Sequence, residues 1–251
     1  MENGKTHFGF KEVNRDSKAG LVKEIFSSVA GKYDLMNDLM SAGIHRVWKN
    51  KMVEEILVRG KSAKFIDVAG GTGDIAFRIA KKMQKENVNY EIDVVDINQE
   101  MLDVGYARSI DNNLFSHLQF IQCDGEKLSF PDETFDFFTI AFGIRNFTNI
   151  DKGLAEANRV LKKGGKFICL EFSKVNDYFL QKIYDAYSFN VIPKIGEVVL
   201  KDRSSYQYLV ESIRRFPTQE NFKKMIEEAG FKNVSYQNLS FGAAAIHIGT
   251  K

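Results

Sequence analysis

Residues 67–74 of this chain read DVAGGTGD and combine glycines with carboxylates in a way that could hold a small cationic ligand. Glycines after a strand let the backbone turn sharply and approach a ligand closely. The third glycine of the dinucleotide fingerprint G-x-G-x-x-G is absent, and two carboxylates would repel a pyrophosphate. A sulfonium nucleoside without phosphate fits better, and S-adenosylmethionine is such a ligand. The contacts expected from this loop are Asp67, Gly70, Gly71, Thr72 and Gly73.

Two further carboxylates follow the next strand-like runs of the chain. Asp96 ends the second run, where a carboxylate can accept hydrogen bonds from both hydroxyls of a ribose. Asp124 follows the third run and could accept from an adenine amino group, with the amide of Gly125 serving a ring nitrogen. Asp96 alone would suit NAD equally well. The order of the three features at successive strand ends is what favours S-adenosylmethionine.

Alternating strand and helix patterns would position these residues. Strand-like runs occupy residues 64–69, 90–96, 118–123, 135–142 and 166–172, helical spacing occupies 20–59, 74–83, 99–109, 151–161 and 218–229, and 162–165 reads as a turn. Such alternation indicates βαβ units with helices on both faces of a parallel sheet. Two runs within residues 231–251 predict a terminal antiparallel pair. We therefore expect an α/β, Rossmann-like, seven-stranded and mostly parallel sheet.

Composition limits the class of protein further. The 251 residues are 44% hydrophobic and 27% charged, which is a globular balance. The net charge of +2 argues against a dedicated nucleic-acid binder. Cys123 and Cys169 form neither a zinc cluster nor a disulfide framework, so no metal is expected and a reducing compartment fits. No run approaches the roughly 18 apolar residues of a membrane span, and residues 1–20 resemble no signal or transit peptide.

Longer strings in the chain resemble one enzyme family. The most specific are YDLMND at 33–38, GIHRVWK at 43–49, TIAFGIRN at 139–146, LEFSK at 170–174 and YQYLVESI at 206–213. With the glycine loop, they make the chain similar, over about residues 6–250, to the ubiquinone/menaquinone biosynthesis C-methyltransferases, a class I S-adenosylmethionine methyltransferase family. THFGF at 6–10 and SIRRFP at 212–217 look most like the mitochondrial and alphaproteobacterial branch that makes ubiquinone.

The resemblance implies methylation of a ring carbon of 2-methoxy-6-polyprenyl-1,4-benzoquinol. Family cofactor contacts carry over to Thr72, Asp96, Asp124 and Gly125, and Ala141 takes the position of the fourth-strand contact. Gly125 replaces a commoner alanine, which we expect to be a small change. Two alternatives stay open: methylation of demethylmenaquinol or another small phenol, and a cofactor-binding scaffold of a quinone-biosynthesis complex without turnover.

Methyl transfer to a ring carbon needs an ionised phenol, and a phenol of pKa about 10 is only ~0.1% ionised at pH 7. Arg145 is expected to stabilise the phenolate or to polarise a bridging water, and Asn146 to orient the same oxygen. A structural salt bridge is the alternative for Arg145. The lone His45 and His247 are expected to pack rather than to catalyse. Substrate contacts are expected from Tyr33, Asn37, Phe142, Tyr184 and Tyr187.

We expect a single methyltransferase domain with four parts: an N-terminal helical cap at 20–59, a cofactor-binding core at 60–173, a helical insertion at 174–217, and a C-terminal helix with a strand pair at 218–251. The insertion is aromatic-rich and would form a lid and an apolar wall for the polyprenyl tail. Peripheral membrane contact follows, on the matrix side of the mitochondrial inner membrane or in bacterial cytoplasm at the membrane. Other quinone-biosynthesis proteins are expected partners, nucleic acid is not, and a homodimer stays open.

Overall fold

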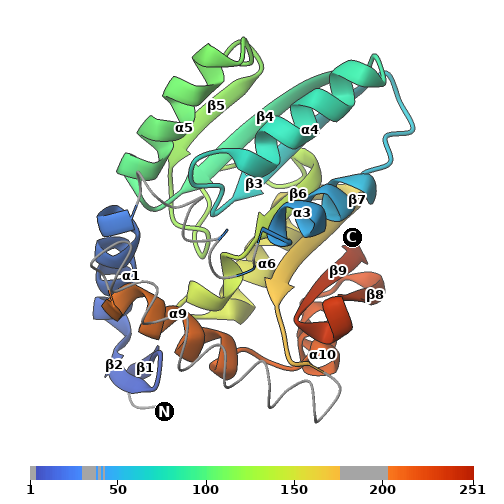
Figure 1. Ribbon diagram of the computed structural model, residues 1–251. Helices are drawn as coiled ribbons and strands as arrows, with labels where there is room; N and C mark the ends of the chain where they lie inside the picture. The colour runs from blue at the N-terminus through green and yellow to red at the C-terminus, as the bar shows by residue number, and fades with distance from the viewer. Residues whose placement is uncertain (1–3, 30–37, 39–40, 42, 176–202) are drawn as a thin grey trace.

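A seven-stranded sheet in the order β5-β4-β3-β6-β7-β9-β8 forms the centre of the protein, seen here in a computed structural model that describes residues 4–29, 38, 41, 43–175 and 203–251 (Figure 1). The strands are β3 (Ser62–Val68), β4 (Asn89–Asp96), β5 (Leu118–Gln122), β6 (Phe135–Ala141), β7 (Leu161–Phe172), β8 (Lys232–Leu239) and β9 (Ala244–Thr250). Pairing is parallel from β5 to β7, whereas β9 runs antiparallel to both of its neighbours. The predicted sheet and its antiparallel C-terminal pair are confirmed.

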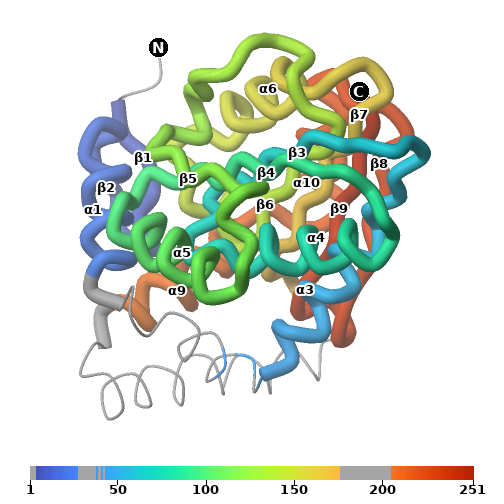
Figure 2. Tube along the Cα trace, turned by 90° about the horizontal axis from the view of Figure 1, so that it is seen from above, coloured from blue at the N-terminus to red at the C-terminus, as the bar shows by residue number. Residues whose placement is uncertain are grey.

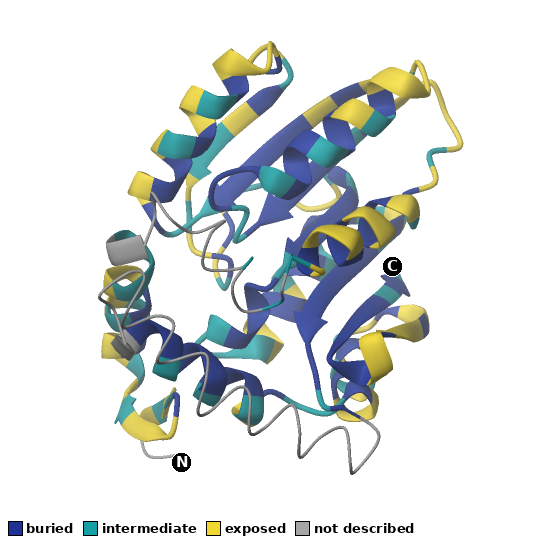
Figure 3. Ribbon diagram, in the orientation of Figure 1, coloured by how far each residue is buried: buried dark blue, intermediate teal, exposed yellow. Residues whose placement is uncertain are grey.

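Helices cover both faces of the sheet. Successive side chains of a strand point to opposite sides, and the strands here are apolar on both sides, so each face needs a covering layer. Phe65 packs into the layer under α3 (His45–Glu54), α4 (Asp74–Lys85) and α5 (Gln99–Asp111). The next residue, Ile66, packs into the opposite layer, under α6 (Ile150–Val160) and α10 (Gln219–Glu228). Figure 2 shows the sheet between α6 and the group of α3, α4 and α5, and Figure 3 shows its central strands buried almost throughout.

The strand order reverses beside β3, which places a binding crevice at that edge of the sheet. The chain runs from β3 outward through β4 to β5, and then returns to place β6 and β7 on the other side of β3. Ligands of open α/β sheets bind beyond the carboxyl ends of the strands at such a reversal. The loops that follow β3, β4, β5 and β6 therefore converge at one place.

Two features of the fold differ from the sequence-based expectation. A hairpin of β1 (Lys5–Phe8) and β2 (Lys11–Asn14) precedes α1 (Arg15–Val29), and the sequence did not predict it. The predicted turn at 162–165 is wrong, because these residues lie inside β7. They form an irregularity in its pairing with β6, in which Gly164 takes a φ of 80° and its amide donates to Lys251 O at 2.9 Å.

Part of the predicted lid lies in the structure as α9 (Arg203–Arg215), whereas residues 176–202 lie outside the described residues. Four of the predicted substrate contacts, Tyr33, Asn37, Tyr184 and Tyr187, also lie outside them. Within the described parts of the chain, every helix is too short or too polar to cross a bilayer.

Candidate active site

A cavity of about 410 Å³ lies at the carboxyl ends of the strands beside the reversal point. Its size falls in the range of about 300–1,000 Å³ that is usual for small-molecule sites. All of the predicted cofactor contacts except Gly73 line it. The predicted residues from four separate strand ends are therefore brought together.

The glycine loop lies against the floor of the cavity and has no room for side chains. A Cβ atom on Gly70 would lie 2.7 Å from Val94 Cγ1 and 2.9 Å from Asp67 O. Gly73 takes a φ of 80° at the position that caps α4, a conformation that glycine adopts without steric cost. Gly73 thus shapes the loop, while the backbone of Gly70 and Gly71 faces the ligand space.

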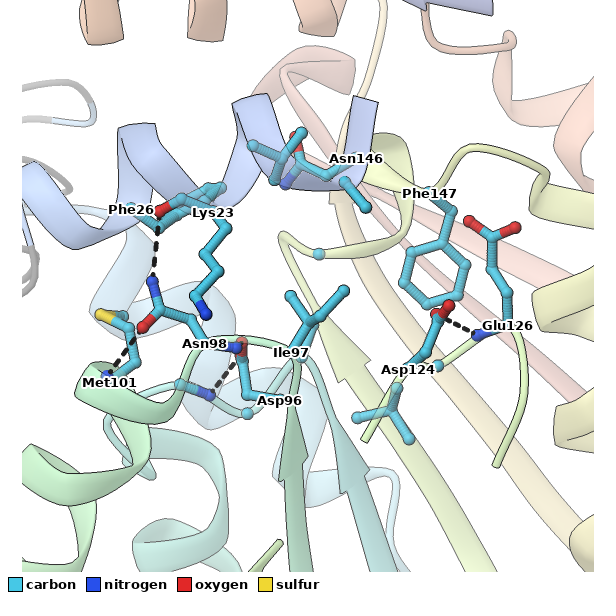
Figure 4. Close-up of a pocket in the computed structure, with 18 of the residues that line it drawn as sticks. Lys23, Phe26, Asp96, Ile97, Asn98, Met101, Asp124, Glu126, Asn146 and Phe147 are labelled. Atoms are coloured by element: carbon cyan, nitrogen blue, oxygen red, sulfur yellow. Dashed lines mark hydrogen bonds between the residues drawn. The ribbon is translucent and has the colours of Figure 1, made fainter. Parts of the chain in front are cut away.

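Asp96 lies at the end of β4 with its carboxylate held by two backbone amides. Gly71 N donates to Oδ2 at 3.0 Å, and Asn98 N donates to Oδ1 at 2.9 Å (Figure 4). Each carboxylate oxygen keeps a further lone pair that can accept from a ribose hydroxyl. Burial raises the pKa of Asp96 to about 6, against the opposing effect of these hydrogen bonds.

Asp67 supplies a buried carboxylate oxygen that needs a partner. Thr139 Oγ1 donates to its Oδ1 at 2.8 Å, whereas Oδ2 makes no hydrogen bond of normal geometry. Burial raises the pKa of Asp67 to about 7. The neighbouring Asp74 is already paired with Lys49 at 2.7 Å. A cationic ligand in the cavity would stabilise the ionised form of Asp67. The carboxylates of the cavity therefore fit a nucleoside that carries a sulfonium and an ammonium group.

Gly125 corrects one expectation from the sequence. A Cβ atom there would lie 2.6 Å from Phe147 Cζ and 2.8 Å from Val68 Cγ1, so alanine is not a small change in this chain. Phe147 occupies the space that an alanine methyl group would need. Beside it, Asp124 lines the cavity and its Oδ1 accepts from the amide of Glu126 at 2.8 Å.

The sequence predicts an N-terminal helical cap at 20–59, and helix α1, which begins at Arg15, covers the cavity. Lys23 and Phe26 of α1 lie above Asp96 in Figure 4. The helix is fastened on one side by Asn98, whose Nδ2 donates to Lys23 O at 3.3 Å, and on the other by Lys18, whose Nζ donates to Phe147 O at 2.7 Å. The helical spacing of its apolar residues predicted the cap, but the sequence singled out none of the α1 residues that line the cavity.

Arg145 does not line the cavity, contrary to the role expected from the sequence. Its side chain is buried and pairs with Glu171 at 2.9 Å, and it also donates to Phe142 O. Glu171 in turn accepts from the amide of Phe172 at 2.9 Å. The guanidinium charge is thus balanced inside the protein, which is the salt bridge that the sequence left as the alternative. Glu171 Oε2 also accepts from the backbone amide of Arg145 at 3.4 Å, which ties the pair to the short helix η2 (Ile144–Asn146).

Asn146 and Phe142 do line the cavity. Asn146 Oδ1 accepts from the hydroxyl of Tyr208 at 2.9 Å. Phe142 has a φ of 57°, and its ring packs against Phe172 and Trp48, with centroids 4.6 and 6.4 Å away. One wall of the cavity is therefore aromatic and another presents a side-chain amide.

The two lone histidines are buried and hydrogen-bonded, as their expected packing roles require. His45 Nδ1 lies 2.8 Å from Ser41 Oγ, and His247 Nε2 lies 2.9 Å from Gln219 O. Burial lowers the pKa of both to about 4, so neither carries a charge at neutral pH.

Comparison with known proteins decides what kind of enzyme this site belongs to. The pattern that defines the ubiE/COQ5 methyltransferase family matches residues 11–251. The chain belongs to this family. It is 52% identical over 242 residues to the ubiquinone/menaquinone biosynthesis C-methyltransferase UbiE of Rickettsia bellii, covering 96% of this chain and 97% of the relative. The UbiE of Rickettsia akari is 51% identical over 244 residues, covering 97% and 98%.

Solved structures of S-adenosylmethionine-dependent methyltransferases share the fold. A possible histamine N-methyltransferase from Thermotoga maritima aligns with a TM-score of 0.61 at 20% identity, covering 91% of this chain and 99% of that one. A putative methyltransferase from Methanococcus maripaludis aligns with a TM-score of 0.57 at 19% identity, covering 100% and 97%. Family and fold together make the protein an S-adenosylmethionine-dependent C-methyltransferase.

The raised pKa values of the cavity carboxylates predict that affinity for S-adenosylmethionine falls in acid. Only the ionised form of Asp96 accepts fully from the ribose, so below its pKa of about 6 a proton must leave before the ligand binds. The dissociation constant should therefore rise as the pH falls, approaching tenfold per pH unit for one group. Asp67, with a pKa of about 7, adds the same trend from a higher pH.

Calorimetric titration between pH 5 and 8, in buffers of different ionisation enthalpy, measures both the affinity and the protons released. Asp96→Asn should bind more weakly at neutral pH and lose part of the pH dependence. An affinity that stays constant from pH 5 to 7 in the unaltered protein would contradict this prediction.

Proposed function

We propose that this protein transfers the methyl group of S-adenosylmethionine to a ring carbon of 2-methoxy-6-polyprenyl-1,4-benzoquinol in ubiquinone biosynthesis. The observation that carries the proposal is the match to the ubiE/COQ5 methyltransferase family over residues 11–251. The cavity supports it, because its strand-end carboxylates suit a cationic nucleoside and the unpartnered Asp67 Oδ2 would gain a favourable charge nearby.

When bound, S-adenosylmethionine supplies a methyl group already activated by its positive sulfur. The protein must make the ring carbon nucleophilic and hold it in line with that group. Ionising a phenol at a pH three units below its pKa costs roughly 4 kcal/mol. A hydrogen bond that stabilises the developing oxyanion therefore lowers the barrier. Of the expected catalytic pair, Arg145 and Asn146, only Asn146 lines the cavity. Its NH₂ group is suited to donate that hydrogen bond.

The chain contributes positioning as well. Phe142 offers a flat wall for an aromatic ring, and α1 covers the nucleoside end of the cavity. Fixing the two reactants in one geometry removes much of the entropic cost of a bimolecular step. Arg145 acts in this scheme through the backbone that it and Glu171 shape, and not by contact with the substrate.

Methylation of demethylmenaquinol is the second candidate, because the relatives are named for both quinones. The purified protein, S-adenosylmethionine and short-tailed versions of the two quinols under reducing conditions would separate the candidates by mass spectrometry of the product. We expect methylation of the benzoquinol at the greater kcat/KM. Preference for demethylmenaquinol would favour the second candidate, and cofactor binding without turnover on either would favour a scaffold.

We further propose that the protein contacts a membrane peripherally, because a polyprenyl quinol is held in a bilayer. The contact would lie on the cytoplasmic side of a bacterial membrane or on the matrix side of the mitochondrial inner membrane. Other quinone-biosynthesis proteins, and a second copy of the chain, are the proposed protein partners. Absence of binding in a liposome flotation assay would count against the membrane contact.

A further inference from the structure

Asn146 is hydrogen-bonded to a tyrosine that is distant in the sequence and does not line the cavity. Tyr208 on α9 donates its hydroxyl to Asn146 Oδ1 at 2.9 Å. Tyr208 is buried, and burial raises its pKa to about 12, with Arg145 opposing the shift and Glu171 adding to it. The phenol therefore keeps its proton throughout the neutral range and remains a hydrogen-bond donor.

This hydrogen bond decides which end of the Asn146 amide is available to a substrate. An asparagine side chain has one oxygen acceptor and one NH₂ group with two donors. Because Tyr208 occupies the oxygen and Tyr208 does not line the cavity, the NH₂ group is left for the cavity that Asn146 lines. A reversed amide would place an acceptor against the substrate oxygen and would repel a phenolate.

Tyr208 is itself held by the N-terminal hairpin. The ring of Phe8 in β1 stacks on the ring of Tyr208, with centroids 4.3 Å apart and planes inclined by 25°. The amide of Phe10 in the hairpin turn donates to Glu211 Oε2 at 2.9 Å, and Glu211 lies on α9 close to Tyr208. Gln207 also donates to Glu211, at 2.7 Å. The hairpin thus restrains α9 at the point where it meets η2.

We propose that Tyr208 is a positioning residue for methyl transfer, which orients the Asn146 amide so that its NH₂ group donates to the reacting oxygen of the phenol. Phe8 and the N-terminal hairpin keep the Tyr208 ring in place for this role. The proposal rests on the proposed function, since the oxygen that Asn146 would contact belongs to the quinol.

The test is Tyr208→Phe, which keeps the ring and its stacking on Phe8 but removes the hydroxyl. Losing control of one amide orientation should lower kcat about tenfold, the equivalent of one ordinary hydrogen bond. The KM for the quinol and the dissociation constant of S-adenosylmethionine should change less than twofold. The pH at which kcat reaches half of its maximum should move upward, because the phenol oxyanion is less stabilised. A merely structural effect would not move this pH.

A double-mutant cycle with Asn146→Ala decides the mechanism. If Tyr208 acts through Asn146, Tyr208→Phe has no further effect on kcat once Asn146 is alanine. Tyr236→Phe, at a half-exposed tyrosine of β8, is the matched control and should leave kcat unchanged. Absence of quinol methylation by the unaltered protein would overturn the proposed function. A wild-type kcat in Tyr208→Phe, or effects that multiply in the double variant, would overturn the role of Tyr208 alone.

Discussion

Replacing Arg145 with alanine is expected to destabilise the protein by about 3–5 kcal/mol, because it leaves a buried carboxylate without its counter-charge. The Glu171 side chain is only 1% exposed and its nearest charge partner is Arg145, at 2.9 Å. Burial raises the pKa of Glu171, and Arg145 opposes that shift. Without the guanidinium, the folded-state pKa of Glu171 rises further above its value in the unfolded chain. The loss of stability should therefore be small in acid and grow as the pH rises.

Urea denaturation between pH 5 and 8 measures this loss, and a double variant provides the matched control. Arg145→Met with Glu171→Gln removes both charges and keeps an acceptor for the amide of Phe172. We expect it to recover most of the stability. An equal loss in the single and double variants would show that the buried charge is not the cause.

The same double variant asks what Arg145 does in the reaction. If it folds, binds S-adenosylmethionine and methylates the quinol, the positive charge of Arg145 is not needed for the chemistry. If it folds and binds but does not turn over, the guanidinium acts directly, as the sequence alone led us to expect. The double variant separates the effect on folding from the effect on catalysis, whereas the alanine variant changes both at once.

Replacing Asn146 with alanine is expected to lower kcat by about 10²–10³-fold, the usual effect of removing one donor to a developing oxyanion. Affinity for S-adenosylmethionine should change less than twofold, because the nucleoside contacts that we predict, Asp96 and Asp124, line the cavity from other strand ends. We expect a large effect because Asn146 lines the cavity, whereas the other expected catalytic residue, Arg145, does not.

Two companion variants test that reason. Asn146→Asp has nearly the same shape but offers only acceptors when ionised, so it should be at least as inactive as alanine. Asn112→Ala, at an exposed asparagine that caps the end of α5, should retain the wild-type kcat. Wild-type turnover in either Asn146 variant would show that this side chain does not stabilise the transition state.

The cofactor half of the site could be predicted from sequence for a simple geometric reason. Each of its residues lies within a few positions of a strand's carboxyl end, as Asp96 does at the end of β4. In a parallel sheet those ends share one edge, so a correct assignment of strands also brings the residues together. The sharp turn at the glycines of residues 70–73 could also be predicted, because backbone conformation is a local property.

Other features depend on contacts that no local pattern reveals. Gly125 reads as an interchangeable small residue until Phe147 is seen in the space beside it. The glycine pair in 162–165 reads as a turn, yet the amide of Gly164 bonds to Lys251 at the other end of the chain. The N-terminal hairpin was missed because its strands are short and pair mainly with each other.

By itself the sequence predicted the parallel sheet, the family, and the edge of the sheet at which the carboxylates of the proposed cofactor site meet. Only the tertiary structure revealed the ion pair of Arg145 with Glu171, because Glu171 lies on the neighbouring strand β7. It also revealed the hydrogen bond from Tyr208 to Asn146, and which residues of α1 line the cavity. The physical reason is that strand ends and glycine turns follow from local backbone preferences, whereas the charge state and orientation of a side chain depend on whichever distant groups fold against it.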